Sequence, residues 1–281
     1  MVHQSSGKAC LIRIAFGKFL VYIRFVMETK LKGLNNFNLF MGSLHFVQAL
    51  IVYLISDPTR GVVPITINYL SFDVATSKLL PATQELFTVN LAWLVVGFFL
   101  LSSFAHFFIA TVYRKSYEEN LKKGINKVRW YEYSLSASVM MVAISLLSGI
   151  YDLSSLIMIF ALDAIMNLLG LAMEQENQGK EKVNWLTFVL GSIAGIVPWI
   201  VYGIYVYGAS KYGGGNIPTF VYWIYGSIFI FFNSFAVNMV LQYKKIGKWS
   251  DYLYGEKAYI VLSLVAKSLL AWQVFGGTLR P

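Results

Sequence analysis

The sequence has little charge and almost no cysteine. Asp, Glu, Lys and Arg make up only 13% of its 281 residues, about half of their share in a typical soluble domain. Hydrophobic residues make up 57%, and the mean hydropathy is +0.60. The one cysteine, Cys10, excludes an intrachain disulfide and a cysteine-rich metal site. The composition therefore indicates a polytopic membrane protein.

Signals for other functional classes are missing as well. A net charge of +9 would favour nucleic acid as the partner of a soluble protein. Here the basic residues flank apolar runs, so membrane topology explains them and no nucleic-acid partner is expected. The chain carries no soluble catalytic domain and no nucleophile–base motif, so we expect neither an enzyme nor a metal site.

Seven apolar segments are long enough to cross a bilayer as helices. They cover residues 35–56, 85–113, 129–150, 153–175, 184–207, 219–243 and 256–279. Only helices and closed barrels satisfy their backbone in lipid, and the alternating pattern of a barrel is absent. We predict an all-α membrane protein with a bundle of seven transmembrane helices. In the connection 57–84, the alternating, β-branched stretch from Val62 to Leu70 predicts a small external β-hairpin between the first two helices.

Lysine and arginine are divided unequally between the two sides of this bundle. Eighteen of them lie on the side of the N-terminus and four on the opposite side. This bias predicts a cytoplasmic N-terminus and an external C-terminus in the cell membrane. Residues 1–34 form a basic, cytoplasmic extension, and residues 35–281 form the seven-helix domain. The extension is an interfacial helix, a segment upstream of a true start at Met27, or a cleaved signal peptide.

Lys267 lies alone near the middle of the last apolar run. A lysine at the bilayer midplane costs at least about 2.5–3.5 kcal/mol on insertion scales. Two arrangements justify it: a buried ion pair, or a Schiff base with a carbonyl cofactor, which a desolvated amine is suited to form. Ser263 precedes Lys267 by four residues and shares its helical face.

Carboxylates are scarce inside the spans, and Glu132 is the best partner for a charged Lys267. An interfacial Glu132 paired with Arg129 is the alternative. Asp163, in the fourth span, is either a neutral hydrogen-bond donor or an ionisable group.

Further polar residues lie in the cytoplasmic halves of the spans. His45 and His106 have similar depths, which favours a shared cavity over two separate core histidines. Gln48, Ser102 and Asn126 are further candidates for this cavity. The outer halves are almost free of polar groups, which argues against a transmembrane proton route.

Aromatic residues make up 16% of the chain. Four of them lie at depths where they would enclose an elongated apolar ligand, although ordinary helix packing is the alternative for each. They are Tyr133, Trp199, Phe232 and Trp272.

Over residues 35–280 the chain resembles the heliorhodopsins. The resemblance rests on Arg129-Trp-Tyr-Glu-Tyr-Ser-Leu-Ser136, Ala194-Gly-Ile-Val-Pro-Trp199, Phe231-Phe-Asn-Ser-Phe-Ala236, Gly247-Lys-Trp-Ser250 and Ala258-Tyr-Ile-Val-Leu-Ser-Leu-Val-Ala-Lys-Ser268, continued by Ala271-Trp-Gln273. It implies a rhodopsin-like bundle, inverted relative to other rhodopsins, that forms homodimers.

The same resemblance assigns site residues. It implies all-trans retinal bound to Lys267 as a protonated Schiff base, with Glu132 as the counterion. His45 and His106 match the histidines of the family's cytoplasmic-side cavity. Ser102, Asn126 and Ser263 fall at polar positions around that cavity. Asp163 replaces an asparagine of a related member near the ring end of the chromophore, where an ionised carboxylate would tune its colour.

Two functions from different classes follow from these residues and the resemblance. The first is a light-sensing photoreceptor that releases the Schiff-base proton into the cytoplasmic-side cavity and signals to a cytoplasmic partner. The alternative is a light-driven proton transporter or channel, because some viral members of the family conduct protons. A light-regulated enzyme would need a separate catalytic partner.

Overall fold

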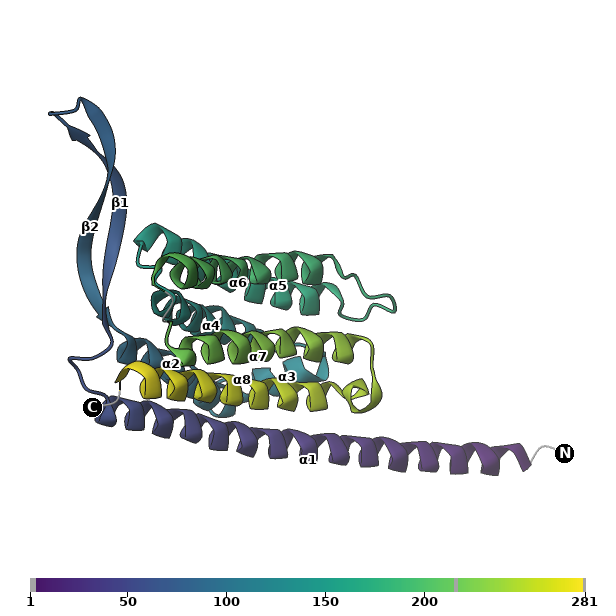
Figure 1. Cartoon of the computed structure of the whole chain (residues 1–281). Coiled ribbons are helices and arrows are strands. Elements are labelled where there is room, and N and C mark those ends of the chain that lie inside the picture. The colour runs from purple at the N-terminus through teal and green to yellow at the C-terminus, as the bar shows by residue number, and fades with distance from the viewer. Residues whose placement is uncertain (1–3, 215–216, 280–281) are drawn as a thin grey trace.

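The computed structural model describes residues 4–214 and 217–279, with side chains for Tyr22 and from Phe25 onward. Within them, the helices are α1 (Gln4–Ile55), α2 (Leu91–Ala110), α3 (Arg114–Lys122), α4 (Lys127–Leu147), α5 (Leu153–Glu176), α6 (Leu186–Tyr212), α7 (Thr219–Tyr243) and α8 (Tyr252–Val274), with a 3₁₀ turn at Gly247–Ser250 and a π-helical turn at Phe275–Leu279. The seven long helices form a bundle (Figure 1) and confirm the predicted fold class.

Six of these helices, within the described residues, are long and apolar enough to cross a membrane. The exception is α4, which carries Arg129, Glu132 and several serines. Most of its polar side chains are buried among the other helices. The least apolar of the seven long helices therefore lies inside the bundle and contributes to the site described below.

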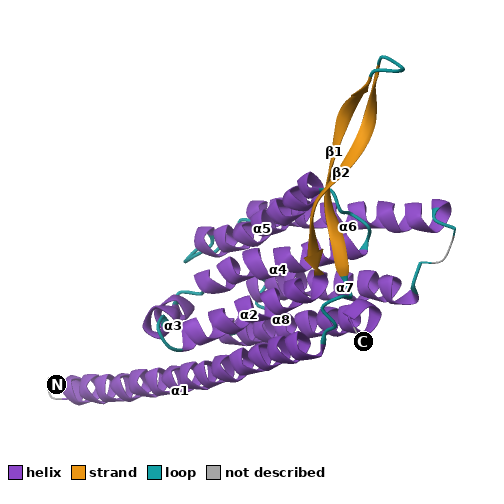
Figure 2. Cartoon of the chain, turned by 90° about the vertical axis from the view of Figure 1, so that its left-hand side faces the viewer, coloured by secondary structure: helices purple, strands orange, loops and turns teal. Residues whose placement is uncertain are grey.

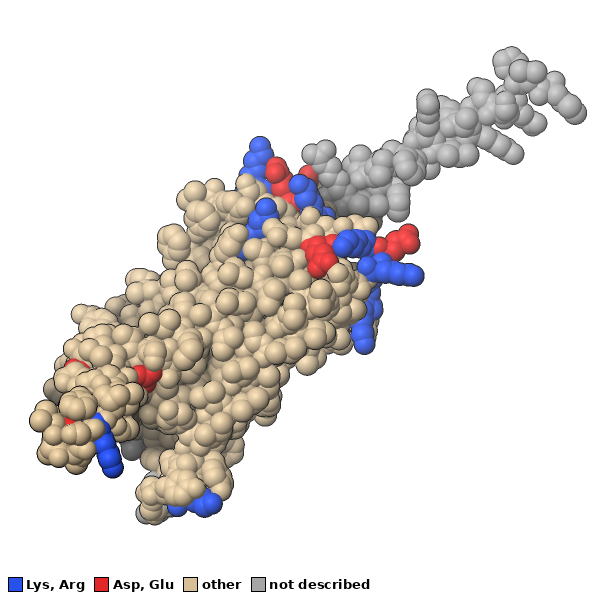
Figure 3. Space-filling view, turned by 90° about the horizontal axis from the view of Figure 1, so that it is seen from above, with Lys and Arg blue, Asp and Glu red and all other residues tan. Residues whose placement is uncertain are grey.

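The two ends of the bundle differ in their connecting elements. At one end, called here the hairpin end, strands β1 (Val62–Asp73) and β2 (Lys78–Asn90) project from the helices. At the other, the α3 end, α3 lies between α2 and α4, and α1 extends beyond the bundle (Figures 1 and 2). The space-filling view shows the visible charged side chains gathered at these two ends, with an almost uncharged band between them (Figure 3). That band is the surface expected of a protein embedded in lipid.

The hairpin between α1 and α2 is confirmed, but it is longer than predicted. Its antiparallel register runs from Val62 opposite Asn90 to Asp73 opposite Lys78, with an irregularity after Ile65. Residues 85–90, predicted to begin the second helix, belong to β2. The side chain of Asn90 accepts a hydrogen bond from the backbone N–H of Ala92, so the helix begins at this cap.

Asp152 fixes the base of the hairpin to α5. Its carboxylate accepts hydrogen bonds from the backbone N–H of Ser155 at 3.0 Å and from that of Asn68 in β1 at 3.3 Å. The backbone N–H of Thr66 also donates to the carbonyl of Tyr151 at 2.9 Å. One aspartate therefore caps a helix and positions the strand beside it.

Two elements at the α3 end differ from the sequence prediction. Position 34 is not a helix boundary, because α1 is continuous from Gln4; residues 1–3 of the predicted extension lie outside the described residues. The short helix α3 was not predicted. It buries Tyr117 and Leu121 in an apolar cluster with Leu31 and Leu253, so tertiary packing stabilises this nine-residue segment.

Candidate functional site

Lys267 lies at the junction of α2, α4 and α8. Its side chain is buried, and its Nζ lies 2.9 Å from Oε1 of Glu132 and 2.9 Å from Oγ of Ser263. The hydroxyl of Ser102 donates a hydrogen bond of 2.6 Å to the same Glu132 oxygen. The structure thus brings together four of the predicted site residues. It also gives Ser263 the position expected from the spacing of four residues along α8.

This arrangement pairs a buried cation with a buried carboxylate. Burial of either charge alone would carry a large desolvation penalty, which the short contact and the added hydrogen bonds offset. The alternative pairing of Glu132 with Arg129 is not the one observed. Arg129 contacts Glu174 and Glu256 instead.

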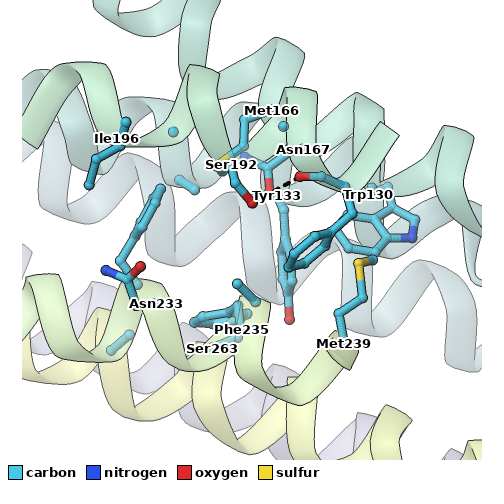
Figure 4. A pocket seen from close by; sticks show the side chains of 18 of the residues that line it. Trp130, Tyr133, Met166, Asn167, Ser192, Ile196, Asn233, Phe235, Met239 and Ser263 are labelled. Carbon is cyan, nitrogen blue, oxygen red and sulfur yellow. Dashed lines mark hydrogen bonds between the residues drawn. The ribbon is translucent and has the colours of Figure 1, made fainter. Parts of the chain in front are cut away.

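A cavity of about 170 Å³ opens beside Lys267. Figure 4 shows its lining side chains, with α5 and α6 on one side and α7 and α8 on the other. The walls are mainly apolar and aromatic, and the predicted wall residues Tyr133, Trp199 and Phe232 are among them. Lys267 and Ser263 belong to the lining, so the amine faces a mainly apolar space.

Trp272 lies away from this cavity, contrary to the prediction. Its side chain is 39% exposed, and its indole N–H donates a 3.3 Å hydrogen bond to Oε1 of Gln48 on α1. Depth along the helix was read correctly, but its direction was not. Trp272 is five residues beyond Lys267, which at 100° per residue places it on a different face of α8.

Glycine makes close packing possible around the cavity. A Cβ atom at Gly170 would lie 2.3 Å from the ring of Trp130, and one at Gly195 would lie 2.4 Å from the sulfur of Met166. Both distances are too short for any side chain. These two glycines therefore let Trp130 and Met166 occupy the positions in which they line the cavity.

Asp163 lies just behind the cavity wall. It is fully buried and accepts hydrogen bonds from Ser138 at 3.0 Å and from the side chain of Asn167 at 3.1 Å. Within the described residues its Oδ1 has no hydrogen-bond partner. Asn167 itself lines the cavity, so it separates Asp163 from the enclosed space.

A second, polar cavity of about 30 Å³ lies on the α3 side of Glu132. Its lining includes three of the predicted polar residues, Ser102, His106 and Asn126. His45 is buried beside it and stacks on His106 with ring centroids 5.5 Å apart. The volume is sufficient for about one or two water molecules. Gln48 does not belong to this cavity, because its side chain turns toward Trp272.

A buried charge cluster farther toward the α3 end was missed by the sequence analysis. Arg129 contacts Glu174 on one side and Glu256 on the other, and all three side chains are buried. Trp130 and Tyr252 add hydrogen bonds to Glu174. Arg129 stands at the start of the third apolar run, and both glutamates lie in the terminal turns of apolar runs. Such positions resemble solvated helix ends, and only the tertiary structure reveals their burial.

The comparisons with known proteins agree with this geometry. The model of the heliorhodopsin family matches residues 34–279. No curated protein matches the chain. Among solved structures, the chain is similar to the crystal structure of cyanorhodopsin N4075R from the cyanobacterium Tolypothrix sp. NIES-4075. The TM-score is 0.59 at 12% sequence identity, over 87% of this chain and 94% of that one. At this identity the likeness concerns the fold alone.

Proposed function

Because the chain belongs to the heliorhodopsin family, we propose that it is a light-sensing retinal photoreceptor that does not pump ions. The proposal rests above all on one observation. Lys267 is a buried amine that faces an apolar cavity and is paired with a single carboxylate, Glu132. A lysine in this environment is suited to hold a carbonyl ligand as a Schiff base.

The residues around Lys267 fit all-trans retinal. Tyr133, Trp199 and Phe232 would enclose an elongated apolar chain, and Asn167 with Asp163 behind it would supply polarity to one wall. When bound, retinal would supply a light-driven isomerisation next to the Lys267 nitrogen. Glu132 would balance a positive charge on that nitrogen, and Ser102 and Ser263 would hold the pair in place.

The polar cavity would receive the proton that leaves Lys267. Its lining includes Ser102, His106 and Asn126, and His45 stacks on His106 beside it. Toward the hairpin end, α2, α4 and α8 pack through residues such as Phe98, Ile144 and Leu270. Beyond Glu132 in the hairpin direction, a buried titratable group, Asp163, lies behind the wall of the apolar cavity and is bonded to Ser138. A proton would therefore move more readily to the α3 side, which favours sensing over transport.

We further propose that the α3 end is cytoplasmic. The excess of lysine and arginine at this end supports that orientation. The protein would then form homodimers in the cell membrane and signal to a cytoplasmic partner near α3, without an enzymatic activity of its own.

Reconstitution with all-trans retinal tests the chromophore. The wild-type protein should acquire a visible absorption band, and Lys267→Ala should abolish it. Lys257→Ala serves as the matched control, because Lys257 lies on the same helix but is exposed. A colourless wild-type protein, or a Lys267→Ala variant that keeps the full band, would contradict the proposal.

The counterion has a separate test. Glu132→Gln should shift the band to longer wavelength, because the negative charge that stabilises the cation at Lys267 in the dark is lost. Glu118→Gln, on α3 and paired with Arg114, should leave the band in place. An unshifted band in Glu132→Gln would remove Glu132 from this role.

Illumination of membranes distinguishes sensing from the alternative, a light-driven proton transporter or channel. Cells that contain the coloured protein should show neither a protonophore-sensitive pH change nor a photocurrent under voltage clamp. Either signal, absent from Lys267→Ala, would establish transport instead.

A further inference from the structure

A chain of hydrogen bonds runs from His106 to Glu256, which both line the polar cavity. Nδ1 of His106 on α2 lies 2.8 Å from Oδ1 of Asn38 on α1. The side-chain nitrogen of Asn38 lies 3.3 Å from the hydroxyl of Tyr117 on α3. That hydroxyl donates to Oε1 of Glu256 on α8 at 3.2 Å. Four helices thus meet along one path of side chains, and Asn38, Tyr117 and Glu256 are each almost fully buried.

The direction of these hydrogen bonds is determined by the backbone. The side-chain nitrogen of Asn38 also donates to the carbonyl oxygen of Leu34 at 3.0 Å. A carbonyl oxygen only accepts hydrogen bonds, so a rotated amide would place two acceptors in contact. The Asn38 oxygen must therefore face His106, and the nitrogen of the ring that contacts it must be the donor.

The far end of the chain supports the same direction. Burial and the neighbouring Glu256 raise the pKa of the Tyr117 phenol well above its usual value, so the phenol keeps its proton. Its O–H donates to the Glu256 carboxylate, and its oxygen is left to accept from Asn38. Glu256 is in turn balanced by Arg129. Every donor in the path therefore points from His106 toward Glu256.

This direction defines the state of the histidine. A neutral imidazole carries one N–H, and a proton on Nδ1 leaves a lone pair on Nε2. Within the described residues, Nε2 of His106 has no hydrogen bond, and the side chain lines the same polar cavity as Glu132 and Ser102. His45 differs, because neither of its ring nitrogens has a partner in the described part of the chain.

We propose that Asn38, held by Leu34, Tyr117 and Glu256, is a positioning residue that fixes His106 as the Nδ1–H tautomer and leaves Nε2 as the atom that accepts the proton. In the transfer, the N–H bond at Lys267 breaks, a new N–H bond forms at Nε2, and the ring becomes a cation that keeps its Nδ1–H on Asn38. The titratable and charged groups around His106 are the ring of His45, Lys267 and, in the lining of the polar cavity, Glu132, Arg129 and Glu256. The transfer rests on the proposed photoreceptor function, whereas the tautomer does not.

The tautomer is measurable in the dark by ¹⁵N NMR of the full-length protein in lipid nanodiscs, with ring-labelled histidine and retinal bound. His106→Gln identifies the signals. The wild-type His106 should be neutral, with its proton on Nδ1. A proton on Nε2, or on both nitrogens, would overturn the proposal.

Substitutions at Asn38 test whether this residue determines the tautomer of His106. Asn38→Leu keeps the approximate volume but removes the acceptor, so His106 should lose its preference for Nδ1–H and the light-induced proton transfer should slow about tenfold. Asn38→Asp removes the N–H donors to Leu34 and Tyr117 but keeps an oxygen acceptor opposite Nδ1, so the proton should stay on Nδ1. Asn35→Leu, at a second buried asparagine of α1, is the matched control and should change neither.

The outcomes separate positioning from packing and from the function itself. An unchanged tautomer in Asn38→Leu, or a proton on Nε2 in Asn38→Asp, would overturn the proposal even if the transfer slows. If Asn38→Leu does not fold, the Asn38→Asp result and the wild-type tautomer still decide. A colourless protein with His106 in the Nδ1–H form would remove the photoreceptor function and leave the positioning role of Asn38 intact.

Discussion

The hairpin end and the α3 end of the bundle bury their helix surfaces with different side chains. At the hairpin end, Phe98, Ile144 and Leu270 belong to one large apolar cluster. The ion pair that the described residues form there, Arg60 with Asp57, is exposed. The α3 end instead buries charged side chains and a directed path of hydrogen bonds from His106 to Glu256. Lys267 lies at the boundary between the two regions.

The difference between the two ends makes the surroundings of Lys267 asymmetric. An apolar interior excludes water and offers no group to which a proton could move. A polar interior offers several groups, provided that their hydrogen bonds are satisfied. Because the polar cavity lies on the α3 side of Glu132, a charge change at Lys267 would be felt mainly toward α3. This one-sidedness supports a sensor more than a pump.

The largest expected effect comes from removal of the central cation at the α3 end. Arg129→Gln leaves Glu174 and Glu256 buried without their common partner, so the free energy of unfolding should fall by about 4 kcal/mol. Thermal unfolding of the retinal-loaded protein, followed by loss of colour, measures it. Arg60→Gln at the hairpin end is the control and should have no measurable effect. Equal effects of the two variants would erase the distinction between the ends.

At the hairpin end, a substitution that leaves a cavity in the apolar cluster should lower stability. Leu270→Ala removes a fully buried side chain of α8 and should lower the free energy of unfolding by about 3 kcal/mol. The absorption band should stay in place, because no charge moves. Leu100→Ala, the same substitution at a lipid-facing position that is 43% exposed, should change stability far less. A large band shift in Leu270→Ala would show that the apolar end also tunes the site.

Substitutions of two adjacent serines of α2 test the boundary between the apolar and the polar region. Ser102→Ala removes the hydrogen bond to Glu132 and should cost about 1–2 kcal/mol of stability and shift the absorption band. Ser103 donates to the backbone carbonyl of Gly42 instead, at 2.9 Å. Ser103→Ala should therefore alter stability without moving the band. Identical band positions in both variants would argue against a role for Ser102 in holding the counterion.

The smallest effect concerns pH at the base of the hairpin. The hydroxyl of Ser154 and the backbone N–H of Ser155 hold the pKa of Asp152 below its usual range. The cap therefore contributes its full stability above the unfolded-state pKa, near about 3.9. That stability is lost as the pH falls through the lower folded-state value. Asp152→Asn should reduce the change in thermal stability between pH 5 and 3, measured by circular dichroism, and an unchanged slope would contradict this account.

Much of the bundle was predictable from the sequence because the position of a residue along a helix gives its depth in the membrane. Apolar run length located the seven helices, and the alternating, β-branched stretch between the first two located the hairpin. The spacing from Ser263 to Lys267 placed both side chains on one face, as observed. Similar depth also brought His45 and His106 together correctly.

The predictions that were wrong or missing share a physical cause. A single helix pattern gives the depth of a residue, but it does not give the rotation of that helix relative to its neighbours. Trp272 and Gln48 have suitable depths, yet they meet on the outside of α1 and α8. The short helix α3 escaped prediction because a nine-residue segment is stabilised by packing rather than by its own propensity.

The sequence by itself determined the membrane class, the number of long helices, the depth of Lys267 and the polar bias toward the α3 end. These properties depend on composition and on periodicity within single segments. The sequence also indicated Glu132 as the partner of Lys267, whereas the tertiary structure alone decided which carboxylates pair with Arg129. The tertiary structure also decided the direction of the path through Asn38 and Tyr117. The hydrogen bonds of this path join four helices, so they depend on the mutual rotation of those helices, and their direction depends on a backbone carbonyl in α1.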